Sequence, residues 1–319
     1  MMTTKEIVAE FVRRCDRAGR SGDADPYSLL DDQVNFMVNG TTPLSGTFPG
    51  LNILKIVLLD TVKKRVRRGS VSAEEFVGTG DRVAALLRIT AETVDGRIYN
   101  ENGETCGCLF RVKDDRITEI FLFPDTTLIE TVIYNRTYVL NQQLKAKAGS
   151  GPSLAPQPQG TRKIESTSKK TPRQVVDQLI TLYIRSFGGE AVDPFEMLDE
   201  NVYYIRHGYV GSEAKCNGLA EVRQKLFPQE VMPNVRFRPG YGTYPVEYIE
   251  EGNRVVVIMK GRGDNARGIP YNNTYFFLFE VRDDKIVRVV EDLDASLSKR
   301  CFWDTHLEES ETPLEGVGK

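Results

Sequence analysis

An internal repeat limits what this chain can fold into more than any other feature of the sequence. The matching segments, each with its shift, are 4–40 on 172–208 (168 positions), 80–87 on 252–259 (172 positions) and 109–117 on 278–286 (169 positions). Long matches with nearly constant shifts indicate one structural unit that occurs twice in the chain. The sequence therefore predicts two copies of a single domain.

The stretch between the two copies has a different composition. It reads KAKAGSGPSLAPQPQGTRKIESTSKKTP, which is rich in Gly, Pro, Ser and Lys and offers almost nothing to bury. Such composition is typical of a flexible linker. We predict domain 1 over residues 1–145, a linker over 146–170, domain 2 over 171–307 and a tail over 308–319.

The length and the charge of the chain narrow the classes of function. The 319 residues suffice for two domains, and a net charge of −3 gives no basic field for nucleic acid or an anionic membrane. No apolar run reaches the roughly 18–20 residues of a membrane span, and acids and bases interrupt the N-terminal segment where a signal peptide needs an apolar core. We expect a cytoplasmic protein that binds neither nucleic acid nor membrane.

Five cysteines, an odd number without regular spacing, argue against a disulfide scaffold. Cys106 and Cys108 form a CxC pair, but a zinc ribbon needs a second pair that the sequence lacks. We expect these side chains to be buried as small apolar groups, and we expect no metal site.

Both copies follow the same order of predicted elements. An amphipathic helix comes first, and its apolar face in domain 2 consists of Val175, Val176, Leu179, Ile180, Tyr183 and Phe187. An Asp-Pro pair then predicts the start of a second helix. An opening strand, a third helix and a run of antiparallel strands follow, and the last two strands are joined by a turn at DDR or DDK. Helices followed by strands predict an α+β fold.

Three motifs resemble the NTF2-like superfamily, and within it the SnoaL-like and ketosteroid-isomerase-like proteins. They are GDADPYSLLDDQVNF with GEAVDPFEMLDENVYY, GDRV with GNRV, and FRVKDDRITEIFLFPD with FEVRDDKIVRVVEDLD. The resemblance implies two tandem cone-shaped domains, each a curved antiparallel sheet wrapped by about three helices around an apolar pocket. It also implies pairing through the sheets, so a tandem chain is expected to form an intrachain pseudo-dimer, and further homo-oligomers stay open.

The last strand is expected to place alternate side chains in the pocket. In the relatives, the odd positions after the isoleucine of the K-I pair face the pocket. In domain 2 this isoleucine is Ile286, so the pocket positions are Val287, Val289, Glu291 and Leu293. The corresponding positions in domain 1 are Thr118, Ile120, Leu122 and Pro124. The epoxide-hydrolase-like pattern has an acid at the fifth position, which is Glu291 in domain 2 and Leu122 in domain 1.

The resemblance also implies a catalytic tyrosine on the first helix and a polar catalytic residue near the end of the opening strand. The tyrosine position is Tyr183 in domain 2 and Cys15 in domain 1. On strand alternation, Tyr203, Ile205 and His207 share the pocket face and Arg206 points away, with a shift of one residue left open. The matching face in domain 1 is Asn35, Met37 and Asn39.

These residues predict acid–base chemistry in domain 2, with domain 1 degenerate or accessory. We expect His207, Glu291 and Tyr183 to be catalytic, since histidine titrates near neutrality and tyrosine can donate to an oxyanion. The predicted substrate contacts are Tyr203, Ile205, Arg206, Val289 and Leu293. None of this chemistry needs a cofactor.

The predicted function is that of a cofactor-independent lyase or dehydratase, or an isomerase or cyclase. It would act on a small, apolar, hydroxylated molecule, and aromatic molecules belong to this class. The alternatives are an epoxide hydrolase and a non-catalytic small-molecule-binding or assembly protein. In the non-catalytic case His207 is a satisfied residue at a strand end and Tyr183 belongs to the core. The sequence does not identify the substrate.

Overall fold

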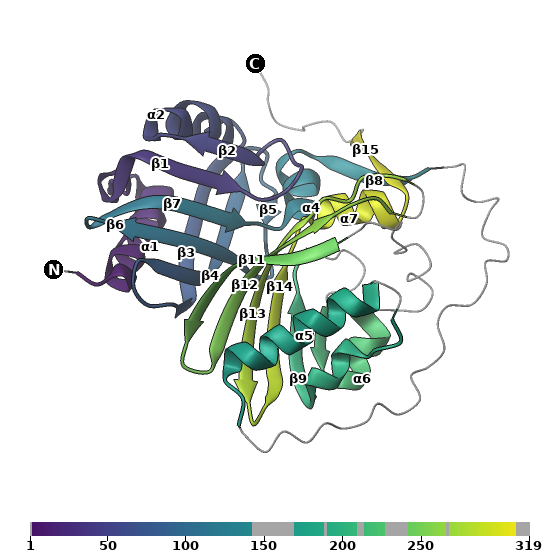
Figure 1. Cartoon of the computed structure of the whole chain (residues 1–319). Coiled ribbons are helices and arrows are strands. Elements are labelled where there is room, and N and C mark those ends of the chain that lie inside the picture. The colour runs from purple at the N-terminus through teal and green to yellow at the C-terminus, as the bar shows by residue number, and fades with distance from the viewer. Residues whose placement is uncertain are drawn as a thin grey trace. The chain divides into compact units, whose positions relative to one another are not determined.

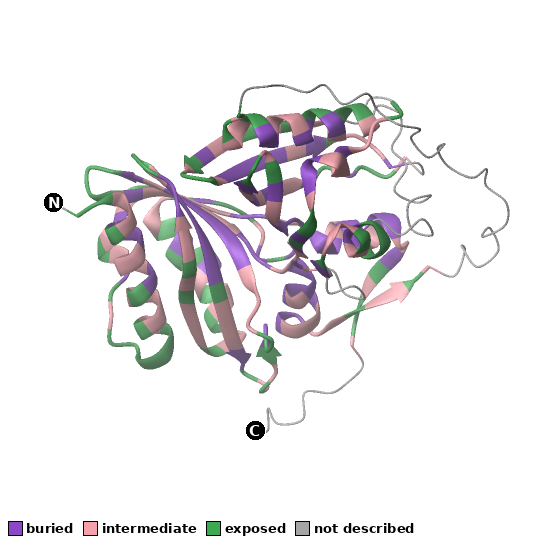
Figure 2. Cartoon of the chain, turned by 90° about the horizontal axis from the view of Figure 1, so that it is seen from below, coloured by how far each residue is buried: buried purple, intermediate pink, exposed green. Residues whose placement is uncertain are grey.

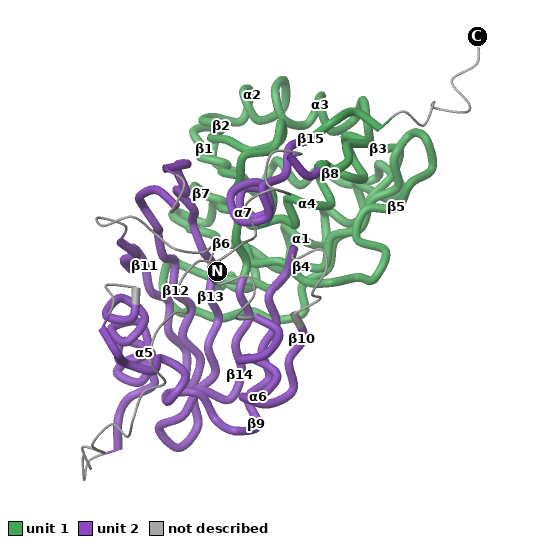
Figure 3. The backbone as a smooth tube through the Cα atoms, turned by 90° about the vertical axis from the view of Figure 1, so that its right-hand side faces the viewer, with its two compact units in different colours: residues 1–139, 292–296, 307–319 green, residues 140–291, 297–306 purple. Residues whose placement is uncertain are grey.

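The computed structural model describes residues 2–141, 169–187, 190–208, 214–226, 242–265 and 268–310. The chain divides into two compact units, coloured separately in Figure 3. Unit 1 comprises residues 1–139, 292–296 and 307–319, and unit 2 comprises 140–291 and 297–306. Most of the predicted linker and tail lies outside the described residues. The predicted domain boundaries and the predicted pseudo-dimer stay predictions.

Unit 1 begins with a long helix, α1 (Thr4–Ser21), and continues mainly as strands. Its further elements are η1 (Tyr27–Leu29), β1 (Leu30–Val38), β2 (Gly46–Pro49), α2 (Leu51–Ile53), η2 (Leu54–Leu59), α3 (Asp60–Lys63), β3 (Val66–Val77), β4 (Arg82–Thr93), β5 (Ile98–Tyr99), β6 (Thr105–Lys113), β7 (Arg116–Phe123), α4 (Thr126–Leu128), η3 (Ile129–Ile133) and β8 (Arg136–Leu140). The sheet order is β2-β1-β7-β6-β4-β3, with β5 on β4 (Figure 1). Helix α1 packs on β3, β4, β6 and β7.

Unit 2 repeats this plan. The elements from residue 172 onward are α5 (Pro172–Phe187), η5 (Pro194–Met197), β9 (Leu198–Arg206), β10 (Ala214–Asn217), α6 (Leu219–Glu221), η6 (Val222–Leu226), β11 (Gly242–Glu251), β12 (Arg254–Arg262), β13 (Thr274–Arg282), β14 (Lys285–Asp292), α7 (Ala295–Phe302) and β15 (Thr305–Glu309). Of these, residues 292–296 and 307–309 group with unit 1. The sheet order is β10-β9-β14-β13-β12-β11, and β15 pairs with β8 in a separate two-stranded sheet. The predicted α+β class is confirmed.

The two sheets share even their irregularities, which supports the duplication in three dimensions. The β3–β4 pairing shifts between Ala73 and Glu75, and the β11–β12 pairing shifts between Pro245 and Glu247, which is 172 positions later. A β-bulge of this kind is a conserved local feature of a strand pair. The repeat found in the sequence is therefore a repeat of backbone geometry as well.

Three details differ from the sequence prediction. The predicted second helix is only a short 3-10 turn in each unit, although Asp193 does accept a hydrogen bond from the Phe195 backbone N–H at 3.0 Å. Strands β2, β5, β8, β10 and β15 and helices α4 and α7 were not predicted. The sheets are not wholly antiparallel, because β1 runs parallel to β7 and β9 runs parallel to β14. That parallel pair brings the opening strand beside the last strand.

The first helix of each unit buries the face that its sequence predicts. In α5 the side chains of Val175, Val176, Leu179 and Ile180 are buried, while Tyr183 is half-buried. Figure 2 shows buried and exposed positions alternating along the helices and strands. Among the described residues, no helix is both long enough and apolar enough to cross a membrane.

Both units close their last hairpin with the predicted Asp-Asp turn. Asp114 and Asp115 have φ values of 50° and 58°, and Asp283 and Asp284 have 49° and 59°. Positive φ at both central residues defines the type I′ turn, whose twist matches that of the flanking strands. The predicted hairpin turns at DDR and DDK are confirmed in both copies.

We expect substitutions at Asp115 to reveal the strain of this turn. Asp115→Gly is expected to raise the free energy of unfolding by up to about 1 kcal/mol, because glycine adopts positive φ without a steric penalty. Asp115→Val is expected to lower it by about 1–2 kcal/mol, since a β-branched side chain clashes there. Urea denaturation measures both, and equal stabilities for the two variants would contradict the turn assignment.

Candidate functional site

The parallel pairing of β9 with β14 determines which side chains meet inside unit 2. Tyr204 lies beside Val289, and Arg206 lies beside Glu291. Paired residues of neighbouring strands point to the same face of a sheet, and alternate residues share that face. Tyr204 and Val289 both belong to the buried core of unit 2, so this is the inner face.

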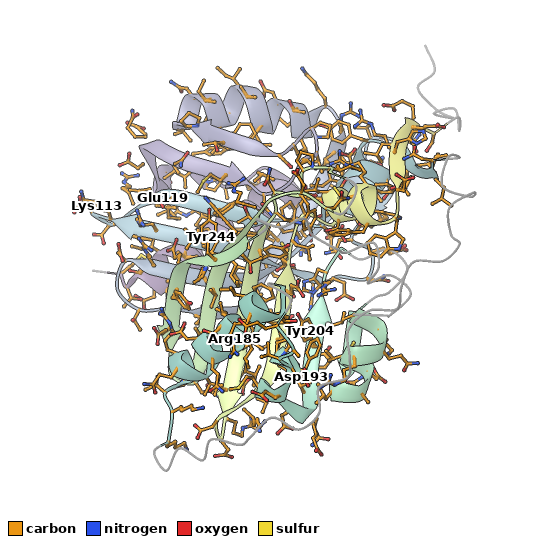
Figure 4. The ribbon with its side chains drawn as sticks, turned by 45° about the vertical axis from the view of Figure 1, so that its right-hand side comes forward. Lys113, Glu119, Arg185, Asp193, Tyr204 and Tyr244 are labelled. Carbon is orange, nitrogen blue, oxygen red and sulfur yellow. The ribbon has the colours of Figure 1, made fainter. Side chains whose placement is uncertain are left out.

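A buried carboxylate is the centre of this inner face. Glu291 is only 4% exposed, and its Oε2 accepts hydrogen bonds from the Tyr204 hydroxyl at 2.5 Å and from Arg206 Nε at 2.7 Å. Arg206 also donates through Nη1 to the Leu226 carbonyl oxygen at 3.3 Å. Both bonds to the carboxylate end on Oε2, and within the part of the chain that the structure describes no group donates to Oε1. Figure 4 labels Tyr204 within unit 2.

Two tyrosines add neutral O–H groups to the site. Burial raises the pKa of Tyr183, the negative charge of Glu291 raises it further, and the positive charge of Arg206 opposes this rise. Burial and the nearby Glu291 likewise hold the pKa of Tyr204 well above its usual value. Both hydroxyls therefore stay protonated at neutral pH and act as hydrogen-bond donors.

An aromatic wall extends along β13. The rings of Tyr275 and Phe277 stack with centroids 5.9 Å apart, and those of Phe277 and Phe279 stack at 5.4 Å. Tyr275 and Phe277 are only partly buried against the core of unit 2. In unit 1, Cys108 pairs with Leu122, and these positions correspond to Phe277 and Glu291 after the shift of 169. The repeat therefore places the aromatic wall next to the carboxylate.

The predicted site residues separate into two groups. Val289 and Glu291 lie on the inner face, as predicted for the last strand. Tyr203 is 37% exposed, so its predicted place in the pocket is wrong, and half-buried Ile205 alternates onto the same outer face. The prediction that Arg206 points away is also wrong, because its guanidinium contacts Glu291.

Two further positions of the last strand also differ from the prediction. Val287 lines a surface cleft of about 410 Å³ together with Asp199 and Arg288, so it does not face the core. Leu293 is buried, but it belongs to the segment 292–296 that groups with unit 1. A pairing shift between Ile286 and Arg288 explains why alternation counted from Ile286 fails at Val287.

His207 follows directly after β9 and is buried. Its backbone N–H donates to the Glu291 carbonyl oxygen at 3.0 Å. Strand alternation places its ring on the face opposite to Arg206, away from the Glu291 carboxylate. The catalytic role of His207 stays a prediction.

Sequence reasoning missed Tyr204, although domain 1 carried a signal for it. Along β1 the alternate residues Val34, Phe36 and Val38 are all apolar, whereas the other face contains Asn35 and Asn39. The apolar face is the buried one. Shifting it by 168 positions gives Val202, Tyr204 and Arg206, which is the inner face of unit 2.

Unit 1 has the same backbone arrangement without the charges. Val38 pairs with Leu122, and the Asn39 backbone N–H donates to the Leu122 carbonyl oxygen at 2.8 Å, as His207 does to Glu291. Phe36 replaces Tyr204, and Cys15 replaces Tyr183. Burial raises the pKa of Cys15 to about 12, so this thiol stays protonated at neutral pH. The equivalent positions of unit 1 hold no group that exchanges protons near neutrality.

Metal ligands do not gather in the described parts of either unit: no three His, Cys, Asp or Glu side chains there come together as a possible ion site.

No protein-family model matches the chain, and no curated protein is significantly similar to it. Solved structures that resemble it include an NTF2-like protein of unknown function from Burkholderia pseudomallei K96243, with 19% identity over 41% of this chain and 96% of its own and a TM-score of 0.33. A putative isomerase from Rhodopseudomonas palustris shows 15% identity over 36% and 87%, with a TM-score of 0.29. A putative SnoaL-like polyketide cyclase from Jannaschia sp. CCS1 shows 16% identity over 44% and 98%, with a TM-score of 0.33. These similarities assign neither a family nor an activity to this chain.

Removing one partner of the buried ion pair should lower the free energy of unfolding strongly, whereas replacing both partners by apolar residues should lower it little. We expect Arg206→Val to lower the free energy of unfolding by about 3–5 kcal/mol, because it leaves the Glu291 carboxylate buried without its cation. The double variant Arg206→Val/Glu291→Leu copies Val38 and Leu122 of unit 1, and it should recover most of that loss. Urea denaturation compares the two, and a double variant no more stable than the single one would contradict the assignment.

The tyrosine environment predicts a loss of stability in alkali. A phenol whose pKa is raised in the folded state stabilises the fold fully below its unfolded pKa of about 10, and this stabilisation is lost as pH rises above that value. We expect the free energy of unfolding to fall above pH ~10, and Tyr204→Phe to show a smaller fall than the wild type. Denaturation at pH 8 and at pH ~10.5 measures this difference, and an unchanged difference in the variant would contradict it.

Proposed function

We propose that unit 2 is a cofactor-independent enzyme that performs acid–base chemistry. It would be either an isomerase or cyclase, or a lyase or dehydratase. Its substrate would be a small, largely apolar molecule with a hydroxyl or carbonyl group. The observation that carries this proposal is the buried Glu291 carboxylate, whose Oε2 is held by Tyr204 and Arg206 while Oε1 accepts no hydrogen bond from the described residues.

Each group has a distinct role in the proposed chemistry. Glu291 takes a proton through Oε1 from a carbon next to a carbonyl or from a hydroxyl, and returns it elsewhere on the substrate. Arg206 and Tyr204 fix the carboxylate through Oε2, so that its orientation does not depend on the substrate. The Tyr183 hydroxyl, protonated at neutral pH, donates a hydrogen bond to the oxygen that becomes negative.

The aromatic wall supports a planar apolar substrate. Tyr275 and Phe277 present stacked rings that are not fully covered by the core. Aromatic faces pack well against flat apolar molecules, and such a wall keeps water away from the reacting atoms. Isomerases and cyclases, the activities named for two of the similar solved structures, perform chemistry of this acid–base class.

A non-catalytic ligand-binding role is the second candidate. One observation favours it: the ion pair between Arg206 and Glu291 is buried, as a purely structural ion pair would be. The two candidates differ in what happens when the carboxylate is made neutral. A base that is lost stops turnover, whereas a binding site that loses one charge still binds an apolar ligand.

The proposal predicts the effect of removing the base. In a screen of hydroxylated aromatic and terpenoid compounds, we expect turnover by the wild type and a decrease of about 10²–10⁴-fold in kcat for Glu291→Gln. The triple variant Tyr204→Phe/Arg206→Val/Glu291→Leu, which copies unit 1, should fold and show no turnover. Leu122→Met in unit 1 is the matched control and should leave kcat unchanged.

Other outcomes of the same screen would overturn the assignment. Turnover by the triple variant would show that the active site does not lie in this cluster. Turnover that is lost in His207→Ala but kept in Glu291→Gln would transfer the acid–base role to His207. Binding of a compound without any turnover would favour the non-catalytic candidate.

A further inference from the structure

A groove in unit 1 lies between α1 and β3, which is an edge strand of its sheet. Its volume is about 600 Å³, within the range of small-molecule sites. Its lining includes Ala9, Val12, Arg13, Arg17, Val71 and Phe76. Its walls are mostly apolar, and two exposed arginines, Arg13 and Arg17, stand at one side of it.

Unit 2 shows what closes the equivalent gap. There the Tyr248 hydroxyl donates to Asp177 Oδ1 at 2.8 Å, which joins β11 to α5. Arg173 covers the Tyr248 ring at 3.1 Å and bonds to Glu250 at 3.1 Å. This network ties the helix directly to the edge strand.

Unit 1 lacks both partners of that closing hydrogen bond. The shift of 172 places Tyr248 on Phe76, and the shift of 168 places Asp177 on Ala9. Neither phenylalanine nor alanine has a polar atom in its side chain, so no such bond can form. Both residues line the groove instead. The groove therefore lies where apolar side chains replace the closing bond of unit 2, although Asp16 still joins α1 to β3 through the Val71 backbone N–H.

Basic groups outnumber acidic groups along α1 beside the groove. A single carboxylate, Glu10, is shared by three guanidinium groups, with Arg14 Nε at 2.6 Å, Arg17 Nη2 at 3.9 Å and Arg13 in direct contact. The other nearby acid, Asp16, already accepts from the Val71 backbone N–H at 3.1 Å and from Arg20 at 2.9 Å. The rim of the groove thus carries an excess of positive charge.

We propose that this groove is a second ligand site, which takes an amphipathic organic anion. The apolar body of the ligand lies against Val12, Val71 and Phe76. Its carboxylate or sulfonate faces Arg13 and Arg17, whose planar guanidinium groups match such oxyanions. The site is independent of the chemistry proposed for unit 2, because none of its residues belongs to that unit.

The test uses the full chain and two probes of known chemistry. The fluorescence of 8-anilinonaphthalene-1-sulfonate reports binding, and decanoate and decanol compete for the site. We expect decanoate to displace the probe and decanol, which lacks the charge, to do so at least about tenfold less well. Arg13→Gln/Arg17→Gln should weaken decanoate binding by about tenfold or more. Arg14→Gln, the same change of charge on a residue of α1 that does not line the groove, should weaken it far less.

A second pair of variants tests the groove itself. Ala9→Asp/Phe76→Tyr transfers the closing bond of unit 2 to unit 1 and should reduce decanoate binding, while Phe76→Tyr alone should not. Near-UV circular dichroism and the melting temperature verify that each variant is folded. The proposal is overturned if decanoate fails to bind, if decanol competes equally well, or if binding is the same in the arginine and closing variants as in the wild type.

Discussion

The parallel pairing between the opening strand and the last strand is the constraint on which the candidate site depends. In each unit the other strand pairs of the sheet are antiparallel, and this one pair places the end of the first strand beside the end of the last. Residues that are 85 positions apart, Arg206 and Glu291, therefore become neighbours on one face. Parallel strands need a long connection between them, and the helical segment and the strands that lie between the two in each copy provide it.

The two copies have used this shared geometry differently. Unit 1 fills the paired positions with Val38 and Leu122, which suits a core and requires no compensation for buried charge. Unit 2 has an arginine and a glutamate there, together with a tyrosine that bonds to the same carboxylate oxygen. Replacing an apolar pair by a buried ion pair is often neutral or unfavourable for stability. The presence of this pair in only one copy is the reason why we propose a role for it beyond folding.

Much of the fold could be predicted from the sequence because it repeats. The duplication, the amphipathic first helix and the Asp-Asp hairpin turns were all visible as patterns. The position of Glu291 on the inner face followed from alternation along the last strand. The site was harder, because both faces of YYIRHG contain an aromatic residue followed by apolar or polar ones. An arginine was assigned to the outside, as burial of a lone charge would require.

That assignment failed for a physical reason that no single strand reveals. Arg206 is buried because Glu291 lies on the neighbouring strand, and the partner of a strand is not encoded in its own alternation. The apolar alternation of domain 1 would have given the correct register once the two copies were compared. The groove beside α1 was beyond prediction, since it depends on a missing hydrogen bond between two elements that are far apart in the sequence.

The most direct test of the account is a crystal structure of the full chain with a hydroxylated aromatic compound that the protein turns over. The account predicts the compound on the inner face of unit 2, stacked near Phe277, with one oxygen or the reacting carbon within about 3.2 Å of Glu291 Oε1. A compound found beside Leu122 of unit 1, or an inner face of unit 2 filled completely by its own side chains, would contradict the account.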